Sequence, residues 1–414
     1  MTIVFGLLGC TAPGLVPDPN PDPVPVNSDV VGKVIVGYQG WFNCAGDGSP
    51  VNSWKHWSNG GTPGPGNIKI ELYPDTREYT SLYSTNFAKL GNGQPAKLFS
   101  SYNDQTIALH FQWMQQYGID GAALQRFGTE ITGGSFKTQR DSIAVKVKTN
   151  AEITGRKFYI MYDTSGMPAA GFDTTIKNDW ISTIVGTLDL TSSPAYAKHE
   201  GKPVVCIWGL GFNDTKHPGD ATQCINLINW FKSQGCYVIG GVPTYWREST
   251  GDSKPEFQAV YKAFNMIEPW LVGRITNSDY KTDVISADWS YCKANGLDYA
   301  PVMFPGFAWS NWNGGAPNAI KRNHGDFLWR QAYNAVSFGI PSGYIAMFDE
   351  YDEGTAIAKA AEDASMIPTD QYFLTLDADG VHCSSDFYLR LAGDLTKMIK
   401  RQIPLTSSHP TAHQ

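Results

Sequence analysis

Several features that mark common protein classes are scarce in this sequence. Only 17% of the 414 residues are charged, and no run of lysine or arginine occurs. Nucleic acids and anionic membranes are bound through clustered positive charge, so we expect neither as a partner. No apolar stretch approaches the roughly 18 residues that a membrane-spanning helix needs, so no transmembrane helix is predicted.

The signatures of several enzyme classes are missing as well. The sequence has no G-x-S-x-G elbow, no HExxH pair, no phosphate-binding P-loop and no glycine fingerprint of a dinucleotide-binding fold. These absences argue against a serine hydrolase, a zinc protease and nucleotide-dependent chemistry. We therefore expect no cofactor.

The seven cysteines show no CxxC pair and no metal-ligand spacing, so structural zinc is not expected. Six of them lie beyond the N-terminal segment: Cys44, Cys206, Cys224, Cys236, Cys292 and Cys383. One or two disulfide bonds are expected if the protein is exported. The alternative for Cys206 and Cys236 is a pair of buried thiols, because both lie in or beside apolar, strand-like runs.

The N-terminal segment predicts export. Residues 7–10 read Leu-Leu-Gly-Cys, which resembles a bacterial lipoprotein cleavage site and makes Cys10 a candidate lipid anchor. The apolar stretch before Cys10 is short and lacks a preceding lysine or arginine, so an incidental apolar terminus is the alternative. We expect an extracytoplasmic protein, either a lipoprotein anchored at the cell surface or a secreted one.

Apolar, strand-like runs alternate with helix-like segments along the rest of the chain. The runs are continuously apolar, as in parallel strands that are covered on both faces. The predicted strands are 33–39, 120–127, 157–163, 203–208, 237–243, 269–275, 299–304 and 343–350, and the clearest helices are 106–118, 141–153, 221–235 and 327–339. This alternation predicts an α/β fold of the (β/α)8 TIM-like barrel type, with a doubly wound open sheet as the alternative.

The predicted domain organisation has one folded unit. Residues 1–10 form the signal-like segment, 11–29 a proline-rich spacer, 30–402 a single (β/α)8 catalytic domain and 403–414 a polar tail. Within the domain, residues 43–100 form a long first loop, and loops of that length in compact domains are usually functional. We expect the protein to be a monomer.

Aromatic residues make up 13% of the chain, which is high. A large aromatic core and sugar-stacking surfaces both account for such a content. In a barrel the carboxyl ends of the strands line the active face, and here those ends carry aromatic side chains and a few carboxylates. This combination is typical of a carbohydrate-binding cleft, so a carbohydrate substrate is expected.

The last predicted strand leads into the densest group of charges, Asp349-Glu350-Tyr351-Asp352-Glu353. Each carboxylate that leaves water costs several kcal/mol unless it is paired or protonated. A group of catalytic acids with unequal pKa values is therefore one interpretation. A calcium site that uses Asp349 and Asp352 is a second, and a solvated acidic turn is a third.

These segments resemble glycoside hydrolase family 99, which contains endo-acting α-mannosidases and mannanases. Residues 348–355, Phe-Asp-Glu-Tyr-Asp-Glu-Gly-Thr, resemble the family's Asn-Glu-Trp-His-Glu-Gly-Thr signature after the last strand. GYQGWF (37–42), with Asp47-Gly48 and Lys55-His56-Trp57 after it, resembles the family's opening block. TIALHFQWMQQYGIDGAAL (106–124) and the Pro-Gly of MFPGFAW (303–309) follow in the same order. The resemblance spans residues 33–360 and overlaps family 71, whose members cut α-1,3-glucan.

The resemblance implies a barrel that hydrolyses α-linked bonds within a glycan chain and retains configuration. Glu350 matches the first signature glutamate, a base that acts on the sugar's own 2-hydroxyl. Glu353 matches the second, which protonates the departing oxygen and later activates water. The substrate-contacting residues predicted from the strand ends and the resemblance are Tyr38, Trp41, His56, Trp57, Arg126, Asp163, Trp208, Tyr245, Trp246, Trp309 and Tyr351.

Three signature positions differ from the family. Asp349 replaces an asparagine, Tyr351 a tryptophan and Asp352 a histidine. The two additional acids are expected to raise the pKa values of their neighbours. The changes also leave open a second hypothesis, a glycan-binding surface lipoprotein that has the same barrel but no activity.

Arg126 stands where the family has an aromatic residue. We expect its guanidinium to point into the cleft and bind a carboxylate or sulfate on the sugar, such as that of a uronate. The alternatives are internal ion pairs with Asp163, with the 349–353 run, or with Glu130.

Overall fold

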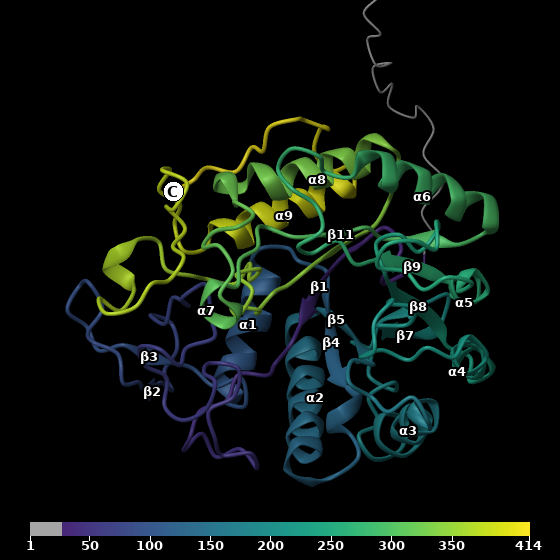
Figure 1. The fold of residues 1–414 in the computed structure, drawn as a ribbon, viewed down its shortest axis with the longest axis horizontal. Helices are drawn as coiled ribbons and strands as arrows, with labels where there is room; N and C mark the ends of the chain where they lie inside the picture. The colour runs from purple at the N-terminus through teal and green to yellow at the C-terminus, as the bar shows by residue number, and fades with distance from the viewer. Residues whose placement is uncertain (1–26) are drawn as a thin grey trace, which may run out of the picture.

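The computed structural model describes residues 27–414, which form a barrel of parallel strands inside a ring of helices (Figure 1). Neighbouring barrel strands are parallel throughout. The strands are β1 (Val34–Tyr38), β4 (Gly121–Phe127), β5 (Lys157–Asp163), β7 (Lys202–Trp208), β8 (Tyr237–Val242), β9 (Met266–Pro269), β10 (Asp298–Tyr299), β11 (Val302–Met303) and β12 (Gly343–Ile345).

The ring closes through one stretch of chain that contains both β10 and β11. β10 pairs with β9, and β11 pairs with β12. Between them, the Ala300 N–H donates to the Ile267 carbonyl at 3.0 Å, and the Pro301 carbonyl accepts from Tyr344 N–H at 3.1 Å. Residues 298–303 therefore act as one barrel strand interrupted at Pro301, whose missing N–H breaks the ladder. The predicted (β/α)8 barrel is confirmed.

A helix follows each barrel strand. The outer helices are α1 (Asp104–Gln116), α2 (Gly134–Thr154), α3 (Phe172–Asp179), α4 (Ala221–Ser233), α5 (Gln258–Lys262), α6 (Thr282–Asn295), α8 (Asp326–Ser337) and α9 (Phe387–Ile399). Local signals set some of their ends: Asp220 caps α4 by accepting from Gln223 N–H, and Gly155 ends α2 with a φ of 66°. None of the described helices is both long and apolar enough to cross a membrane.

The predicted strand at 269–275 is wrong by about three residues. The sixth barrel strand is β9, Met266–Pro269, and residues beyond Pro269 turn away. Glu268 explains the error, because a carboxylate inside a short apolar run makes that run look unlike a buried strand. Leu271 and Val272, which follow this strand closely, are buried as well, so hydrophobicity alone could not separate the two positions.

The long first loop, residues 43–100, packs as a layer over one side of the barrel mouth (Figure 1). It contains only a short hairpin, β2 (Tyr83–Ser84) and β3 (Lys97–Leu98). Most of its aromatic side chains are buried, and Trp57 and Phe99 pack edge-to-face at 5.0 Å. Much of the aromatic content of the chain therefore builds core under this loop.

The cysteines beyond the N-terminal segment are all buried free thiols. The expected disulfide bonds are absent from the described part of the chain, and Cys206 and Cys236 are buried thiols as the alternative predicted. The C-terminal residues 403–414 lie against the barrel, since the Thr406 carbonyl accepts from the Trp329 indole at 2.8 Å. Cys10 and most of the predicted spacer lie outside the described residues.

Candidate active site

The acidic segment, residues 348–355, folds back on itself where the chain leaves β12. The Phe348 N–H donates to the Gly37 carbonyl at 2.7 Å, which joins the segment to β1. The Glu350 carbonyl accepts from the N–H groups of Thr355 and Ala356 at 3.2 and 2.9 Å. Glu350 and Glu353 are therefore held on one tight turn at the carboxyl end of the barrel, where active sites of this fold lie.

Asp349 anchors this turn to the end of β1. Its carboxylate accepts the N–H groups of Gln39 at 2.7 Å and Gly40 at 2.9 Å, one on each oxygen. Burial raises the pKa of Asp349 to about 6, although these two hydrogen bonds act in the opposite direction. Both oxygens are thus committed to the backbone, which makes Asp349 a structural acid.

Glu350 is buried, with an exposed fraction of 6%. The Thr355 hydroxyl donates to its Oε2 at 3.0 Å. Burial raises the pKa of Glu350 well above its ordinary value, and the charges of Glu353 and Asp352 raise it further. The carboxyl group is therefore a strong base whenever it loses its proton.

Glu353 is partly exposed and lies on the same turn. Burial and then the charge of Asp352 raise the pKa of Glu353 to about 7, while Arg274 lowers it. The Ala308 N–H donates to the Glu353 backbone carbonyl at 3.0 Å and fixes this position against the loop after β11. Because Glu350 and Glu353 repel as anions, the two together hold a proton near neutral pH.

Asp352 is paired with His56 from the first loop, at 3.4 Å between Oδ2 and Nδ1. Its other oxygen, Oδ1, is buried without a hydrogen-bond partner among the described residues. The His56 ring stacks on Trp41 with centroids 3.8 Å apart, and burial lowers the pKa of His56 despite the neighbouring carboxylate. His56 thus contacts the acidic segment directly and Trp41 packs against His56, while the contact of both residues with a substrate stays a prediction.

The calcium alternative finds no support in this geometry. Asp349 is saturated by backbone N–H groups, and Asp352 faces an imidazole. Within residues 27–414 no group of three or more histidine, cysteine, aspartate or glutamate side chains converges as a metal site. Burial and the charge of Asp352 instead raise the pKa values of Glu350 and Glu353.

Strand register decides which side chains face the barrel interior. Phe127, Asp163, Trp208, Gly241 and Glu268 are successive cross-strand partners. Their side chains share one face, because pairing at the same level of a parallel sheet preserves side-chain direction. The alternate face carries Arg126, which contacts the helix layer, so the first set faces inward.

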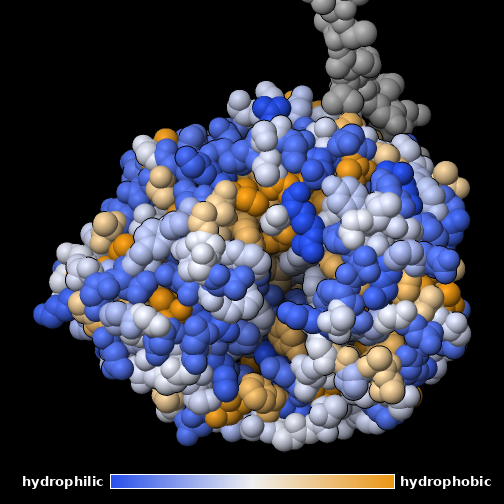
Figure 2. All heavy atoms as spheres, in the orientation of Figure 1, coloured by the Kyte–Doolittle hydropathy of each residue, from blue (hydrophilic) through white to orange (hydrophobic). Residues whose placement is uncertain are grey.

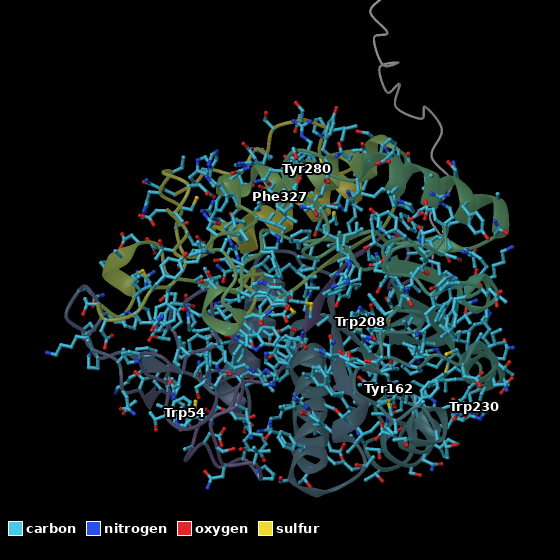
Figure 3. All side chains as sticks on the ribbon, viewed as in Figure 1. Trp54, Tyr162, Trp208, Trp230, Tyr280 and Phe327 are labelled. Atoms are coloured by element: carbon cyan, nitrogen blue, oxygen red, sulfur yellow. The ribbon has the colours of Figure 1, made fainter. Side chains whose placement is uncertain are left out.

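Two predicted residues, Asp163 and Trp208, belong to this inward-facing set. The Asp163 carboxylate accepts from the Gln125 amide at 2.9 Å and from Ser165 N–H at 2.8 Å. The Trp208 indole lies over Gly241, where a Cβ would come within 2.3 Å of the ring. Trp208 stands near the centre of the molecule (Figure 3), where the surface is hollowed (Figure 2).

Glu268 was missed from the sequence because its strand was placed too late. It is 4% exposed, and the one hydrogen-bond partner of its carboxyl among the described residues is the Cys206 thiol at 4.0 Å. Burial raises the pKa of Glu268 to about 8. The signal that would have found it is a single acid inside the apolar run 264–271.

Arg126 does not face the cleft, which corrects the predicted contact with an anionic sugar. Its guanidinium is 2% exposed and donates to Asp179 Oδ1 and Oδ2, at 2.6 Å each, and to Asp141 Oδ1 at 2.6 Å. Its partners are on α3 and α2, and are none of the three alternatives predicted. Position 126 is one residue from Phe127, and a shift of one residue turns a side chain to the other face of a strand.

Four of the predicted aromatic contacts lie in the core. Tyr38 is fully buried on the outer face of β1 and hydrogen-bonds His110 of α1 at 2.9 Å. Trp57 donates to the Phe99 carbonyl at 3.0 Å under the first loop, and Tyr351 packs near it at 6.1 Å between centroids. Trp246 donates to Asp288 of α6 at 2.9 Å. Each is fully buried, which corrects its assignment as a substrate contact.

Tyr245 and Trp309 are partly exposed on the loops that follow β8 and β11. Trp309 packs against Phe307 with centroids 5.1 Å apart. Arg274 was missed from the sequence; it binds Asp252 at 2.7 Å and places a positive charge near Glu353. The mouth thus combines aromatic side chains, several acids and the positive charge of Arg274.

Solved structures share this arrangement of elements. Two structures of the family 99 endo-α-mannosidase from Bacteroides thetaiotaomicron, one with bis-tris-propane, superpose with a TM-score of 0.64 at 16% sequence identity. They cover 90% of this chain, which in turn covers 98% and 100% of theirs. A glycoside hydrolase-like protein superposes with a TM-score of 0.53 at 15% identity, covering 91% of this chain and 97% of its own. No protein-family model and no curated protein sequence matches the chain.

The chain has the barrel fold of the family 99 structures. The resemblance predicted from the ordered motifs is thereby confirmed for the fold. At this level of identity the similarity speaks for fold alone, so the chemistry rests on the residues of the site.

Proposed function

We propose that this protein is a glycoside hydrolase that cleaves bonds within an oligosaccharide or polysaccharide. The observation that carries the proposal is the pair Glu350 and Glu353, two acids with raised pKa values on one turn at the carboxyl end of a barrel. The fold neighbours support it, because they are described as an endo-α-mannosidase and a glycoside hydrolase-like protein.

We assign the two glutamates different roles. Glu353 donates its proton to the departing glycosidic oxygen as the bond to the anomeric carbon breaks, and it later takes a proton from the attacking water. Glu350 accepts the proton of the sugar's own 2-hydroxyl, whose oxygen attacks the anomeric carbon. A pKa of about 7 supports the first role, because a large fraction of Glu353 stays protonated near neutral pH. Two successive displacements give retention, and we propose α-linked bonds and internal cleavage.

Paired substitutions test these roles. Glu350→Gln and Glu353→Gln should each lower kcat for an unactivated oligosaccharide by roughly a thousandfold or more, with the fold retained by circular dichroism. A substrate whose leaving group needs no proton, such as a glycosyl fluoride, should restore the first displacement in Glu353→Gln. The same substrate should not rescue Glu350→Gln, which still lacks its base.

The wild-type reaction provides the reference for both variants. Product analysis over a panel of α-mannans, α-glucans and uronate-bearing glycans gives the sugar class and the size of the fragments. Near-normal turnover in both variants would overturn the assignment of the pair. Glycan binding with no bond cleavage by the wild type would favour the second function, a binding protein on the same barrel.

We further propose that the protein is exported and carries a lipid on Cys10. The Leu-Leu-Gly-Cys sequence at residues 7–10 and the proline-rich residues after it support this proposal. Mass spectrometry of the mature protein from its host tests it, and an unmodified N-terminus upstream of Cys10 would contradict it.

A further inference from the structure

Two large aromatic side chains are exposed beside the barrel mouth. Trp312 is 42% exposed and Tyr372 is 43% exposed, whereas Trp57, Trp113, Trp246 and Trp329 are almost fully buried. Leaving an indole half in water forgoes much of the stabilisation that its burial would give. The exposure of Trp312 therefore calls for an explanation outside the folding of the chain.

Trp312 continues a row of rings that starts beside Glu353. Phe307 and Trp309 have centroids 5.1 Å apart, and Trp309 and Trp312 have centroids 6.2 Å apart. We call Phe307, Trp309 and Trp312 the aromatic ridge. Its first two members flank Ala308, whose N–H donates to the Glu353 carbonyl at 3.0 Å.

The ridge stands on a rigid support. Trp312 lies on α7 (Ser310–Asn313), a short helix between the barrel and the first loop (Figure 1). Buried Glu71 of that loop accepts from the Ser310 hydroxyl at 2.8 and 2.9 Å and from Asn311 N–H at 3.1 Å. The Asn311 amide donates to the Tyr372 carbonyl at 2.9 Å, which places the backbone of the exposed Tyr372 beside α7.

The flanks of the ridge are polar. The Lys69 ammonium lies 5.1 Å from the centroid of the Trp312 ring. The Gln371 amide donates to the Asn311 side chain at 3.0 Å, beside Tyr372. An aromatic surface with amide and ammonium groups at its edge suits a sugar, which offers C–H groups on its ring faces and hydroxyls on its rim.

We propose that the aromatic ridge is a binding subsite for sugar units of a glycan chain that lie beyond the bond cleaved at Glu353. The inference rests on the proposed function for the position of that bond. It adds that the substrate is a chain long enough to leave the barrel mouth and cross α7. Rings fixed on a preformed support bind such a chain without ordering a loop first.

Dependence on chain length tests the proposal. For the wild type, kcat/KM should rise as an oligosaccharide series becomes long enough to reach the ridge and then stay level. Trp312→Ala should not show that rise. Its kcat/KM should be about tenfold below the wild-type value on the longest substrates and equal to the wild-type value on the shortest. The matched control is Ile181→Ala, which removes a 52% exposed side chain from the outer helix layer and should follow the wild-type curve.

A binding measurement separates failure of the ridge from failure of the proposed function. Affinity electrophoresis in a soluble polysaccharide uses Glu353→Gln with and without Trp312→Ala, so no hydrolysis occurs. Retardation that disappears with Trp312 supports the subsite even if the wild type cleaves nothing. Unchanged retardation, together with an unchanged chain-length curve in Trp312→Ala, would overturn the subsite while leaving the proposed hydrolysis intact.

Discussion

At the scale of single residues, Asp352 controls the proton affinity of the proposed catalytic pair. Its charge raises the pKa of both Glu350 and Glu353, and no arginine or lysine within residues 27–414 pairs with it. The family 99 signature that this segment resembles has a histidine at this position. Asp352 therefore places a negative charge where that signature has a neutral or positive side chain. We expect that exchange to be visible in the pH dependence of the reaction.

Asp352→Asn should lower the pKa of Glu353 and move the alkaline limb of the kcat profile to lower pH. The sign follows from the role of Glu353, which must be protonated to act as an acid, so activity falls as pH rises through a pKa of about 7. Loss of one nearby negative charge should shift the limb by roughly half to one pH unit. Steady-state kinetics from about pH 5 to about pH 9 measure this shift.

The control for this prediction is Asp288→Asn. Asp288 is also a buried carboxyl, but it accepts from Trp246 and Arg247 in the helix layer, at 2.9 and 3.0 Å. Its substitution should leave the alkaline limb where it is. A limb that stays fixed in Asp352→Asn, with the fold intact, would contradict the electrostatic role.

The sequence predicts that a given side chain faces the site only where the predicted strand position is correct to within one residue. Asp163 and Trp208 were found at strand ends and do face inward. Tyr38 and Arg126 are also near strand ends, yet each lies on the outer face. Side chains alternate along a strand, so an error of one residue reverses the conclusion, and sequence patterns seldom fix a strand end that closely.

At the scale of elements, one arginine side chain holds the acidic segment in place. Arg322 is 3% exposed, and its Nη2 donates to the Gly354 carbonyl at 2.7 Å and the Ala356 carbonyl at 2.8 Å. Its guanidinium lies 4.4 Å from the centroid of the Tyr388 ring of α9. Arg322, which precedes Glu353 by 31 positions in the sequence, thus fixes the turn that carries this glutamate.

Arg322→Met should lower kcat by roughly 10- to 100-fold while KM changes little, because a displaced Glu353 no longer meets the glycosidic oxygen. Arg322→Lys should recover part of the loss, since an ammonium can still donate to one carbonyl. The control Arg126→Lys alters a buried arginine of β4 that faces the helix layer, and it should affect thermal stability more than kcat. A lower melting temperature with an unchanged kcat in Arg322→Met would show that Arg322 serves stability alone.

The elements themselves were predictable where their patterns were long. Helices α1, α2, α4 and α8 and most barrel strands occur where the apolar patterns predicted them. The support of the acidic turn was not predictable, because Arg322 and Glu71 come from irregular segments that carry no periodic signal. Glu71 binds the Ser310 hydroxyl and a backbone N–H of α7, and Arg322 binds the carbonyls of Gly354 and Ala356. Only the folded chain brings these groups together.

At the scale of the whole molecule, the barrel encloses a carboxyl group that its core does not neutralise. Glu268 faces the interior, where the groups around it are the Cys206 thiol and the hydroxyls of Tyr159, Tyr237 and Tyr344. None of these supplies a positive charge. The fold was nevertheless predictable as a (β/α)8 barrel, because the strand and helix alternation over the full chain outweighs one acid in one strand.

Glu268 should make the stability of the barrel depend on pH. Burial raises its pKa from an ordinary 4.5 to about 8, so the folded state binds this proton more tightly than the unfolded state. Its stabilising contribution is then complete below the unfolded pKa and is lost as pH rises through about 8. Glu268→Gln cannot ionise, so the free energy of unfolding of the wild type should fall relative to this variant as pH rises from about 4.5 to about 8, by about 5 kcal/mol.

Urea unfolding of both proteins on the acidic and the alkaline side of this range measures the difference. The comparison isolates Glu268, because Glu350, Glu353 and Asp288 also have raised pKa values and give both proteins the same background slope. Glu256→Gln, which alters an exposed carboxyl, should run parallel to the wild type. If Glu268→Gln also runs parallel to the wild type, the carboxyl is solvated or paired in solution. If the two proteins diverge as pH rises from about 4.5 to about 8 and run parallel above that range, ionisation of Glu268 limits the stability of the whole barrel.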